Sequence, residues 1–166
     1  MIGGNQGDRR ALIRQATELI RQSIGTVVLA SSIHETKPWG TFGVVSDGRR
    51  VGDFLNQALV VETELAAHRV LEEALVIEAV LGRLRPVTPQ VAVHGVAELP
   101  QRVYQSRPMD IDIIFYNDEV IDTPDLTVPH PRMHLRRFVL EPLAEIMPDY
   151  RHPVLKKTVK ELLDEV

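Results

Sequence analysis

The chain has 166 residues, of which 44% are hydrophobic and 25% are charged, and its formal net charge is −4. This composition predicts one globular domain over residues 1–166, and no apolar run approaches the roughly 20 residues of a membrane-spanning helix. The sequence has no cysteine, which excludes disulfides and thiolate-bound metals, and its acidic balance argues against nucleic acid as the main partner.

The first ten residues, MIGGNQGDRR, contain no basic segment followed by an apolar one. A secretion signal has that order, so we expect none here. A cysteine-free chain is compatible with a reducing compartment, and we therefore expect a cytoplasmic protein.

In the first half of the chain, helix and strand patterns alternate. Apolar residues at helical spacing predict a helix from Asp8, a typical N-cap residue, to Gly25. The β-branched segment 26–32 and the segment 53–64 predict strands. Helical spacing returns over 67–82, where a glycine ends the second predicted helix.

Two stretches interrupt this alternation and predict long mobile loops. Segment 35–52 contains glycines, a proline and a charged turn, and its Trp39 is either an exposed loop aromatic or part of a lid. Segment 83–107 contains three prolines and little periodicity. A loop of that length in a small domain is typical of a functional lid or a disordered insertion.

The last third of the chain returns to regular patterns. Residues 105–121 alternate like a strand that leads into a turn and a short second strand, and residues 134–147 and 155–166 have helical spacing. Strands and helices joined by such unequal connections indicate an α+β fold with helices on one or both faces of a sheet.

Asp110 and Asp112 stand out in the strand-like run because they are two residues apart. Residues at that separation in a strand point to the same face, where two carboxylates repel unless a cation or strong donors compensate. A pair of carboxylates suits Mg²⁺, which keeps several waters and often binds substrate phosphates. The alternative is an exposed polar face on an edge strand, since this spacing is common.

Arginines bracket this aspartate pair on both sides in the sequence. The guanidinium fork matches phosphate oxygens, although any single arginine is more often a solvated surface charge. The set consists of Arg83, Arg85, Arg102, Arg107, Arg132, Arg136 and Arg137.

Five further residues are candidates with ordinary alternatives. His130 lies between two prolines and is by itself more often a structural histidine. Phe54 and Phe138 are near polar, arginine-rich segments, although phenylalanine is more often a core residue. Asn56 in an apolar strand needs hydrogen-bond partners, which the edge of a heterocycle would supply. Glu78 occupies a helix position that predicts a boundary residue exposed to water.

Five segments, in the expected order along nearly the whole chain, resemble the 6-hydroxymethyl-7,8-dihydropterin pyrophosphokinase (HPPK) family. The most specific feature is an arginine three residues before the aspartate pair, followed downstream by LTVPH. The segments are GGNQGDR, ETKPWG, FLNQALVVET, IEAVLGR and SRPMDIDIIFYNDEVIDTPDLTVPHPRMHLRRFVLEPLAEI.

The resemblance implies a ferredoxin-like α+β sandwich with a mixed or antiparallel sheet, helices on both faces and long mobile loops. It also implies transfer of the β,γ-pyrophosphoryl group of ATP to the hydroxymethyl oxygen of the pterin in folate biosynthesis, leaving AMP. In that family the two aspartates bind two Mg²⁺ ions. We further expect a monomer whose partners are these two small molecules, without nucleic acid or membrane.

Position by position, the resemblance implies three groups of site residues. The catalytic group is Arg83, Arg107, Asp110 and Asp112, with both aspartates also binding metal; the ATP-binding group is Glu78, Arg85, Ile113, Thr127, His130 and Arg136; and the pterin-binding group is Thr36, Pro38, Trp39, Phe54, Asn56 and Phe138.

Departures from the family pattern leave two other functions open. Leu75 and Pro131 replace residues frequent at the ATP site, Tyr104 replaces a loop tryptophan, and most of the first strand expected before GGN is absent. These departures allow a binding module that has the fold without the activity. Another Mg²⁺-dependent nucleotide or phosphoryl transferase is the third possibility, but Asn56 with two phenylalanines favours a flat heterocyclic acceptor.

Overall fold

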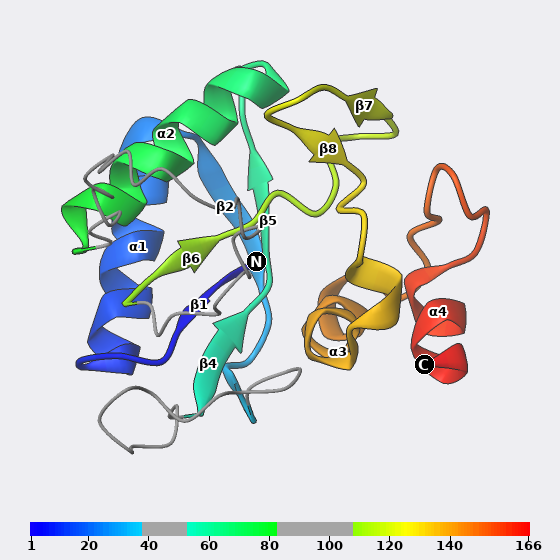
Figure 1. The fold of residues 1–166 in the computed structure, drawn as a ribbon, viewed down its shortest axis with the longest axis horizontal. Coiled ribbons are helices and arrows are strands. Elements are labelled where there is room, and N and C mark those ends of the chain that lie inside the picture. The colour runs from blue at the N-terminus through cyan, green and yellow to red at the C-terminus, as the bar shows by residue number, and fades with distance from the viewer. Residues whose placement is uncertain (38–52, 83–107) are drawn as a thin grey trace, which may run out of the picture.

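The computed structural model describes residues 1–37, 53–82 and 108–166. The described residues form short strands and four α-helices (Figure 1). In chain order the elements are β1 (Ile2–Gly4), α1 (Arg9–Ser23), β2 (Thr26–Ala30), β3 (His34–Thr36), β4 (Phe54–Gln57), β5 (Leu59–Glu62), α2 (Ala67–Val80), β6 (Asp110–Ile111), β7 (Ile121–Asp122), β8 (Thr127–Val128), the 3-10 turn η1 (Met133–Leu135), α3 (Arg137–Ile146) and α4 (Val159–Glu165).

The central sheet has the strand order β3-β4-β1-β6, and all of its pairings are antiparallel. β2 and β5 form a separate antiparallel pair, and β7 and β8 form another. Only Ala58 separates β4 from β5, and its N–H and C=O both bond to Ser31, at 2.9 Å each. The strand predicted over 53–64 is therefore present, with a break at Ala58 that turns its second half toward β2.

Helices cover both faces of the sheet, so the predicted α+β architecture is confirmed (Figure 1). On one face, α1 and α2 bury Ile13, Ile20 and Ile77 against Ile2 and Leu55 of the strands. On the other face, α3 and α4 pack in a second apolar cluster, whose buried members are Ala58, Ile114, Met133, Val139, Leu140, Leu143, Val159 and Leu162. The sheet therefore separates two apolar cores.

The helix ends follow local sequence signals. The Asp8 side chain accepts a hydrogen bond from the N–H of Ala11 at 3.1 Å, which confirms it as the N-cap of α1. Thr158 and Glu161 form a reciprocal capping box at the start of α4. After α2, Gly82 has φ +97°, a left-handed conformation that glycine adopts without a steric penalty.

Two expectations about the strands need correction. The strand predicted within 105–121 is regular only over Asp110–Ile111, because the chain after Asp112 leaves the β1 edge. Glu35 and Thr36, which we expected in a loop, pair with β4 as part of β3. The rest of that loop, like the long loop predicted over 83–107, lies outside the described residues. None of the described helices is both long and apolar enough to cross a membrane.

Candidate active site

A row of four residues crosses the central sheet from β3 to β6. His34 of β3 pairs with Asn56 of β4, Asn56 pairs with Gly3 of β1, and Gly3 pairs with Asp110 of β6. Cross-strand partners point to the same face of a sheet, and adjacent strands are about 4.8 Å apart. The row therefore places the predicted pterin residue Asn56 and the predicted metal ligand Asp110 on one face, about 10 Å apart.

Gly3 keeps the space between Asn56 and Asp110 open. A Cβ atom at this position would lie 2.5 Å from Oδ1 of Asn56 and closer still to the carbonyl oxygen of Leu55. Any larger residue would therefore displace the Asn56 amide or the β4 backbone. The first G of the GGN segment is required by packing at the centre of this row.

Asn56 and Thr36 are joined by a hydrogen bond. The Asn56 amide nitrogen donates to the Thr36 hydroxyl at 3.0 Å, and both side chains are partly buried. Phe54 is two residues before Asn56 in the same strand and pairs with Thr36 across β3. The structure therefore brings together three of the predicted pterin-binding residues, on the face that carries Asp110.

Helix α3 covers this same face and carries Phe138. It packs against both β3 and β4, and its Phe138 side chain is partly buried beside the second apolar cluster. The guanidinium carbon of Arg136 lies 5.7 Å from the centroid of the Phe138 ring. Phe54 and Phe138 thus project from elements that are packed together, one from the sheet and one from the helix.

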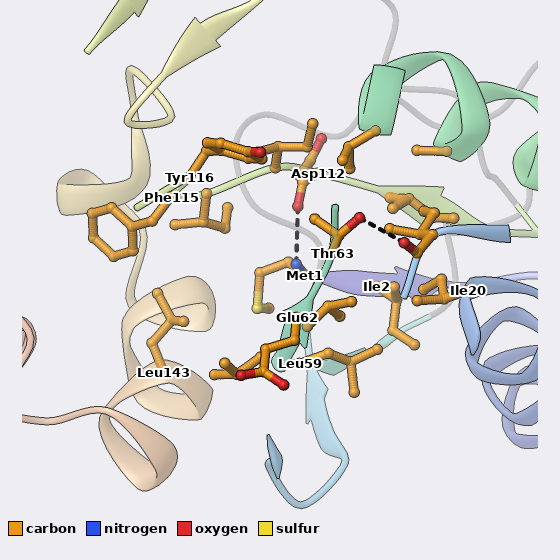
Figure 2. A pocket seen from close by; sticks show the side chains of 18 of the residues that line it. Met1, Ile2, Ile20, Leu59, Glu62, Thr63, Asp112, Phe115, Tyr116 and Leu143 are labelled. Atoms are coloured by element: carbon orange, nitrogen blue, oxygen red, sulfur yellow. Dashed lines mark hydrogen bonds between the residues drawn. The ribbon is translucent and has the colours of Figure 1, made fainter. Parts of the chain in front are cut away.

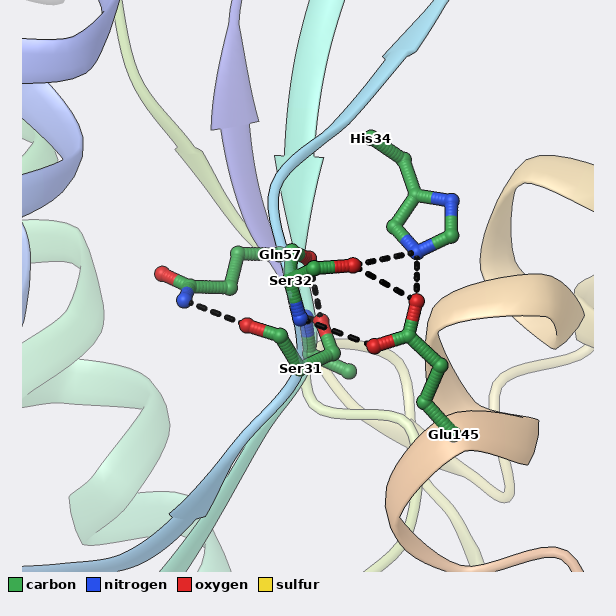
Figure 3. A network of polar contacts seen from close by, with 6 residues as sticks. Ser31, Ser32, His34, Gln57 and Glu145 are labelled. Atoms are coloured by element: carbon green, nitrogen blue, oxygen red, sulfur yellow. Dashed lines mark hydrogen bonds and ion pairs between the residues drawn. The ribbon is translucent and has the colours of Figure 1, made fainter.

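A polar network fixes α3 to the strand edge next to the row (Figure 3). The Glu145 carboxylate accepts hydrogen bonds from the N–H and hydroxyl of Ser32, at 2.8 and 2.7 Å, and also contacts Nε2 of His34. None of these three residues was predicted as a site residue from the sequence. Because 113 residues separate Ser32 from Glu145, no local pattern signals this contact.

Asp112 directly follows β6 and extends its antiparallel pairing by one residue. Its backbone exchanges two hydrogen bonds of 2.9 Å with Met1, one of which is drawn in Figure 2, and Met1 packs on the α3 side of the sheet. The predicted shared face of the two aspartates follows from this pairing. Burial lowers the pKa of the Met1 amino group, whereas the carboxylates of Asp112 and Asp110 raise it.

Glu78 differs from the expectation of a water-exposed boundary residue. Its side chain is 3% exposed, and its carboxylate accepts a hydrogen bond from the N–H of Ile111 at 3.0 Å. The exposed interpretation was wrong because α2 packs against β6, which the helical pattern alone does not reveal. Glu78 therefore holds the strand that carries Asp110.

His130, Arg136 and Asp110 share one electrostatic neighbourhood. Burial and then the Arg136 guanidinium lower the pKa of His130 to about 4, and the Asp110 carboxylate partly opposes them. The Nδ1 atom of His130 accepts a hydrogen bond from the N–H of Arg132 at 3.2 Å, so the histidine also orders its own turn. The structural and the ligand-binding interpretations of His130 are compatible.

The other predicted ATP-binding residues are less closely grouped. Ile113 packs in a third apolar cluster with Leu126 and Val128. Thr127 is exposed in β8, where it pairs with Asp122 of β7. The five remaining predicted site residues lie outside the described residues; they are Pro38, Trp39, Arg83, Arg85 and Arg107.

The described part of the chain contains no group of three or more histidine or acidic residues that could hold a metal. Asp110 and Asp112 offer two carboxylates on one face. That donor set fits Mg²⁺ bound jointly by protein, water and substrate phosphates, and it does not fit a metal held by protein alone.

Comparison with known proteins finds one family that is similar to this chain. The model of the family described as 7,8-dihydro-6-hydroxymethylpterin-pyrophosphokinase (HPPK) matches residues 1–148. A Bacillus subtilis (strain 168) protein named 2-amino-4-hydroxy-6-hydroxymethyldihydropteridine pyrophosphokinase is 40% identical over 146 residues, which is 87% of this chain and 74% of that protein. Proteins of the same name from Porphyromonas gingivalis (strain ATCC 33277) and Aquifex aeolicus (strain VF5) are 33% and 32% identical, covering 92% and 99% of this chain and 90% and 88% of theirs.

Solved structures share the fold at low sequence identity. A crystal structure of HPPK-DHPS in complex with substrates has a TM-score of 0.67 and 14% identity, covering 99% of this chain and 42% of that chain. Plasmodium falciparum HPPK-DHPS with pteroate has a TM-score of 0.70 and 16% identity, covering 99% and 43%. This chain spans less than half the length of those solved chains, and the likeness to them concerns the fold.

Proposed function

The chain belongs to the 7,8-dihydro-6-hydroxymethylpterin-pyrophosphokinase family, and we propose that its active site is the α3-covered face of the sheet between β3 and β6. Its activity is that of a 2-amino-4-hydroxy-6-hydroxymethyldihydropteridine pyrophosphokinase. It transfers pyrophosphate from ATP to the hydroxymethyl group of the pterin, giving AMP and the pterin diphosphate, in folate biosynthesis.

The acceptor half of the proposed site is formed by Thr36, Phe54, Asn56 and Phe138. Asn56 is already oriented by its bond to the Thr36 hydroxyl, which leaves its carbonyl oxygen to accept from the pterin edge. Phe54 and Phe138 come from packed elements, and an aromatic pair favours a flat ring between them. Pro38 and Trp39, outside the described residues, are proposed to contribute loop contacts to the pterin.

The phosphate half of the proposed site is centred on Asp110 and Asp112, which would hold Mg²⁺. We propose two ions. Bound there, Mg²⁺ would neutralise phosphate charge and lower the pKa of the acceptor hydroxyl. The part played by the chain is to hold both carboxylates on one face, through the Glu78 bond to Ile111 and the Met1 bonds to Asp112.

Positively charged and donor side chains are proposed to position the triphosphate. Arg136 and His130 lie in the electrostatic neighbourhood of Asp110, where a phosphate oxygen could accept from both. The other proposed nucleotide contacts are Glu78, Ile113 and Thr127, together with Arg83, Arg85 and Arg107, which lie outside the described residues. Charge neutralisation and alignment supply most of the acceleration in such displacements.

One observation carries this assignment: the row that joins Asn56 to Asp110 through Gly3. The Asn56 amide, which we propose reads the heterocycle, and the Asp110 carboxylate, which we propose binds metal, lie on one face about 10 Å apart in this row. That separation accommodates a bicyclic ring whose hydroxymethyl group points toward the carboxylates. The acceptor and the phosphates can then meet without movement of the sheet.

The assignment is tested with Asp110→Asn and Asp112→Asn, and with Asp164→Asn as the matched control. Asp164 is an exposed aspartate in α4, a helix that carries no residue of the proposed site. With ATP, Mg²⁺ and the hydroxymethyl pterin, we expect AMP formation to fall at least about 100-fold in the first two variants, with unchanged circular dichroism. Near-normal turnover in both variants, or an equal loss in Asp164→Asn, would contradict the proposed site.

We also propose that residues 1–166 act as one monomeric domain in the cytoplasm. The family match over residues 1–148 and the antiparallel sheet shared by both halves of the described chain support a single unit. Light scattering during gel filtration measures its mass. A dimer mass at micromolar concentration would contradict the monomer.

A further inference from the structure

Arg9 contacts two strands that carry residues of the proposed pterin site, although the proposed function does not use this arginine. It is the first residue of α1, and its side chain is 33% exposed. Its Nη1 atom donates a hydrogen bond to the carbonyl oxygen of Asp53 at 2.9 Å and lies 3.7 Å from Oε1 of Glu35. One guanidinium group therefore contacts the chain just before β4 and a side chain of β3.

Both contacts of Arg9 adjoin a residue of the proposed pterin site. Glu35 directly precedes Thr36, and Asp53 directly precedes Phe54. Thr36 and Phe54 are cross-strand partners. The Asp53 carbonyl belongs to the planar peptide unit that ends at the Phe54 nitrogen, so a bond to that carbonyl restrains the backbone from which the Phe54 ring projects.

Arg9 makes these contacts from the face of the sheet opposite to the proposed site. Its partner Glu35 pairs with Leu55, which is 1% exposed and packs in the first apolar cluster with α1. Thr36 and Asn56 alternate with these residues and point to the other face, which α3 covers. Figure 1 shows α1 and α3 on opposite sides of the sheet. Arg9 can therefore influence the acceptor only through the strands.

The pair that Arg9 adjoins is at the end of a short ladder. β3 has three residues and, within the described ranges, pairs only with β4. Thr36 and Phe54 form the last of the three pairs, and terminal pairs of a short edge strand open at little cost in free energy. The Glu145 carboxylate binds Ser32, before the other end of β3. Arg9 thus supports the end of the ladder that the Glu145 network does not reach.

The two contacts of Arg9 differ in strength. The bond to the Asp53 carbonyl has a charged donor and an ordinary hydrogen-bond length, and such bonds are stronger than those between neutral groups. The Glu35 carboxylate is farther away and its side chain is 53% exposed, so this ion pair is screened by water. Most of the effect of Arg9 should therefore pass through Asp53 to Phe54.

We propose that Arg9 is a positioning residue for the acceptor, which keeps Thr36 and Phe54 aligned for pterin binding by holding the Asp53 carbonyl and the Glu35 carboxylate. This inference rests on the proposed function, because it assigns Arg9 to the pterin half of that site. The phosphate half should be unaffected, since β6 with Asp110 is two strands away from β4 in the sheet.

The test compares Arg9→Ala with Arg10→Ala as the matched control. Arg10 is the next residue of α1, is exposed, and makes no hydrogen bond or ion pair with any other described residue. Both variants remove one positive charge from the first turn of the helix. Arg9→Ala should raise KM for the pterin about fivefold or more and change kcat and KM for ATP by less than about twofold. Arg10→Ala should change none of the three constants by more than about twofold.

Two further variants separate the contacts of Arg9. Arg9→Lys keeps the charge but not the guanidinium donors, so its KM for the pterin should lie between those of wild type and Arg9→Ala. Glu35→Gln removes only the exposed ion pair and should raise this KM less than about twofold.

Amide hydrogen exchange without substrate tests the strand contacts independently of activity. The amides of Thr36 and Phe54 should exchange faster in Arg9→Ala than in wild type. No AMP formation by wild type would contradict the proposed function. With an active wild type, a pterin KM of Arg9→Ala within twofold of wild type, an equal rise in KM for ATP, or unchanged exchange would overturn the role of Arg9.

Discussion

Glu145 of α3 binds the backbone N–H of Ser32, at 2.8 Å, just before the chain enters β3. The Ser32 hydroxyl donates to the same carboxylate at 2.7 Å, so one side chain makes two bonds to one residue. Since β3 carries Thr36 and α3 carries Phe138, this link sets the spacing between the sheet and helix sides of the proposed pterin site.

We expect the stability contributed by Glu145 to depend on pH. Hydrogen bonds from the Ser32 hydroxyl and N–H, together with His34, lower the pKa of Glu145 from 4.5 to about 2. The native state then binds fewer protons than the unfolded state between those values, so the contribution is complete above pH 4.5 and is lost as pH falls toward 2. The difference in free energy of unfolding between wild type and Glu145→Gln, measured by urea denaturation, should therefore decrease as pH falls through this range.

Glu141→Gln is the matched control for Glu145. Glu141 is on the same helix and forms an ion pair with Arg137 at 2.6 Å. Among the described residues it makes no hydrogen bond or ion pair with β3, so it does not link the helix to the proposed site. Glu145→Gln should also raise KM for the pterin more than it lowers kcat, because it loosens the acceptor side. An equal KM change in Glu141→Gln would argue against a positioning role for Glu145.

Glu78→Ala should destabilise the protein by about 1–3 kcal/mol, because the buried N–H of Ile111 loses its acceptor. Turnover should also fall, since Ile111 is next to Asp110 in β6. Glu72→Ala removes an exposed ion pair with Arg69 on the same helix and should cost at most about 0.5 kcal/mol. Urea denaturation of both variants checks the difference, and equal losses would contradict the role of Glu78.

His130 should titrate near pH 4 in the free protein, well below its ordinary value of 6.5. Arg136→Gln removes a positive neighbour and should raise the pKa of His130, whereas Asp110→Asn should lower it. Proton NMR of the imidazole against pH measures both shifts. A pKa that neither variant moves would show that the three residues are not electrostatic neighbours.

The low pKa of His130 also predicts how the free energy of unfolding depends on pH. A histidine whose native pKa lies below its unfolded pKa disfavours the native state in acid, so His130 should lower stability as pH falls from 6.5 to about 4. His130→Gln should flatten the pH dependence of unfolding in that interval. A profile unchanged from wild type would contradict the low pKa.

Gly3→Ala should weaken both the fold and acceptor binding. The added Cβ would lie 2.5 Å from Oδ1 of Asn56, which predicts a loss of about 1–3 kcal/mol in stability and a raised KM for the pterin. Ile2→Val, on the opposite face of the same strand, should cost about 0.5–1.5 kcal/mol and leave KM unchanged. Unfolding and steady-state assays of the two variants separate loss of site geometry from loss of stability.

The local elements could be predicted because their signals lie within a few residues. The periodicity of α1, its Asp8 cap and the glycine that ends α2 are each encoded within one or two helical turns. The aspartate pair was identified in the same way, because a two-residue period determines which face both carboxylates occupy. The shared face of Asp110 and Asp112 was therefore predictable from a short stretch of sequence, and their role in binding metal stays a prediction.

Tertiary structure decided the contacts that connect distant segments. The burial of Glu78 depends on α2 meeting β6, and the Glu145–Ser32 bond joins residues 113 positions apart. The row from Asn56 through Gly3 to Asp110 depends on strand register, which packing of the whole sheet selects because a one-residue slip would turn every side chain to the other face. Sequence alone thus determined the elements and the reactive residue types, whereas their placement within one site required the energy of long-range packing.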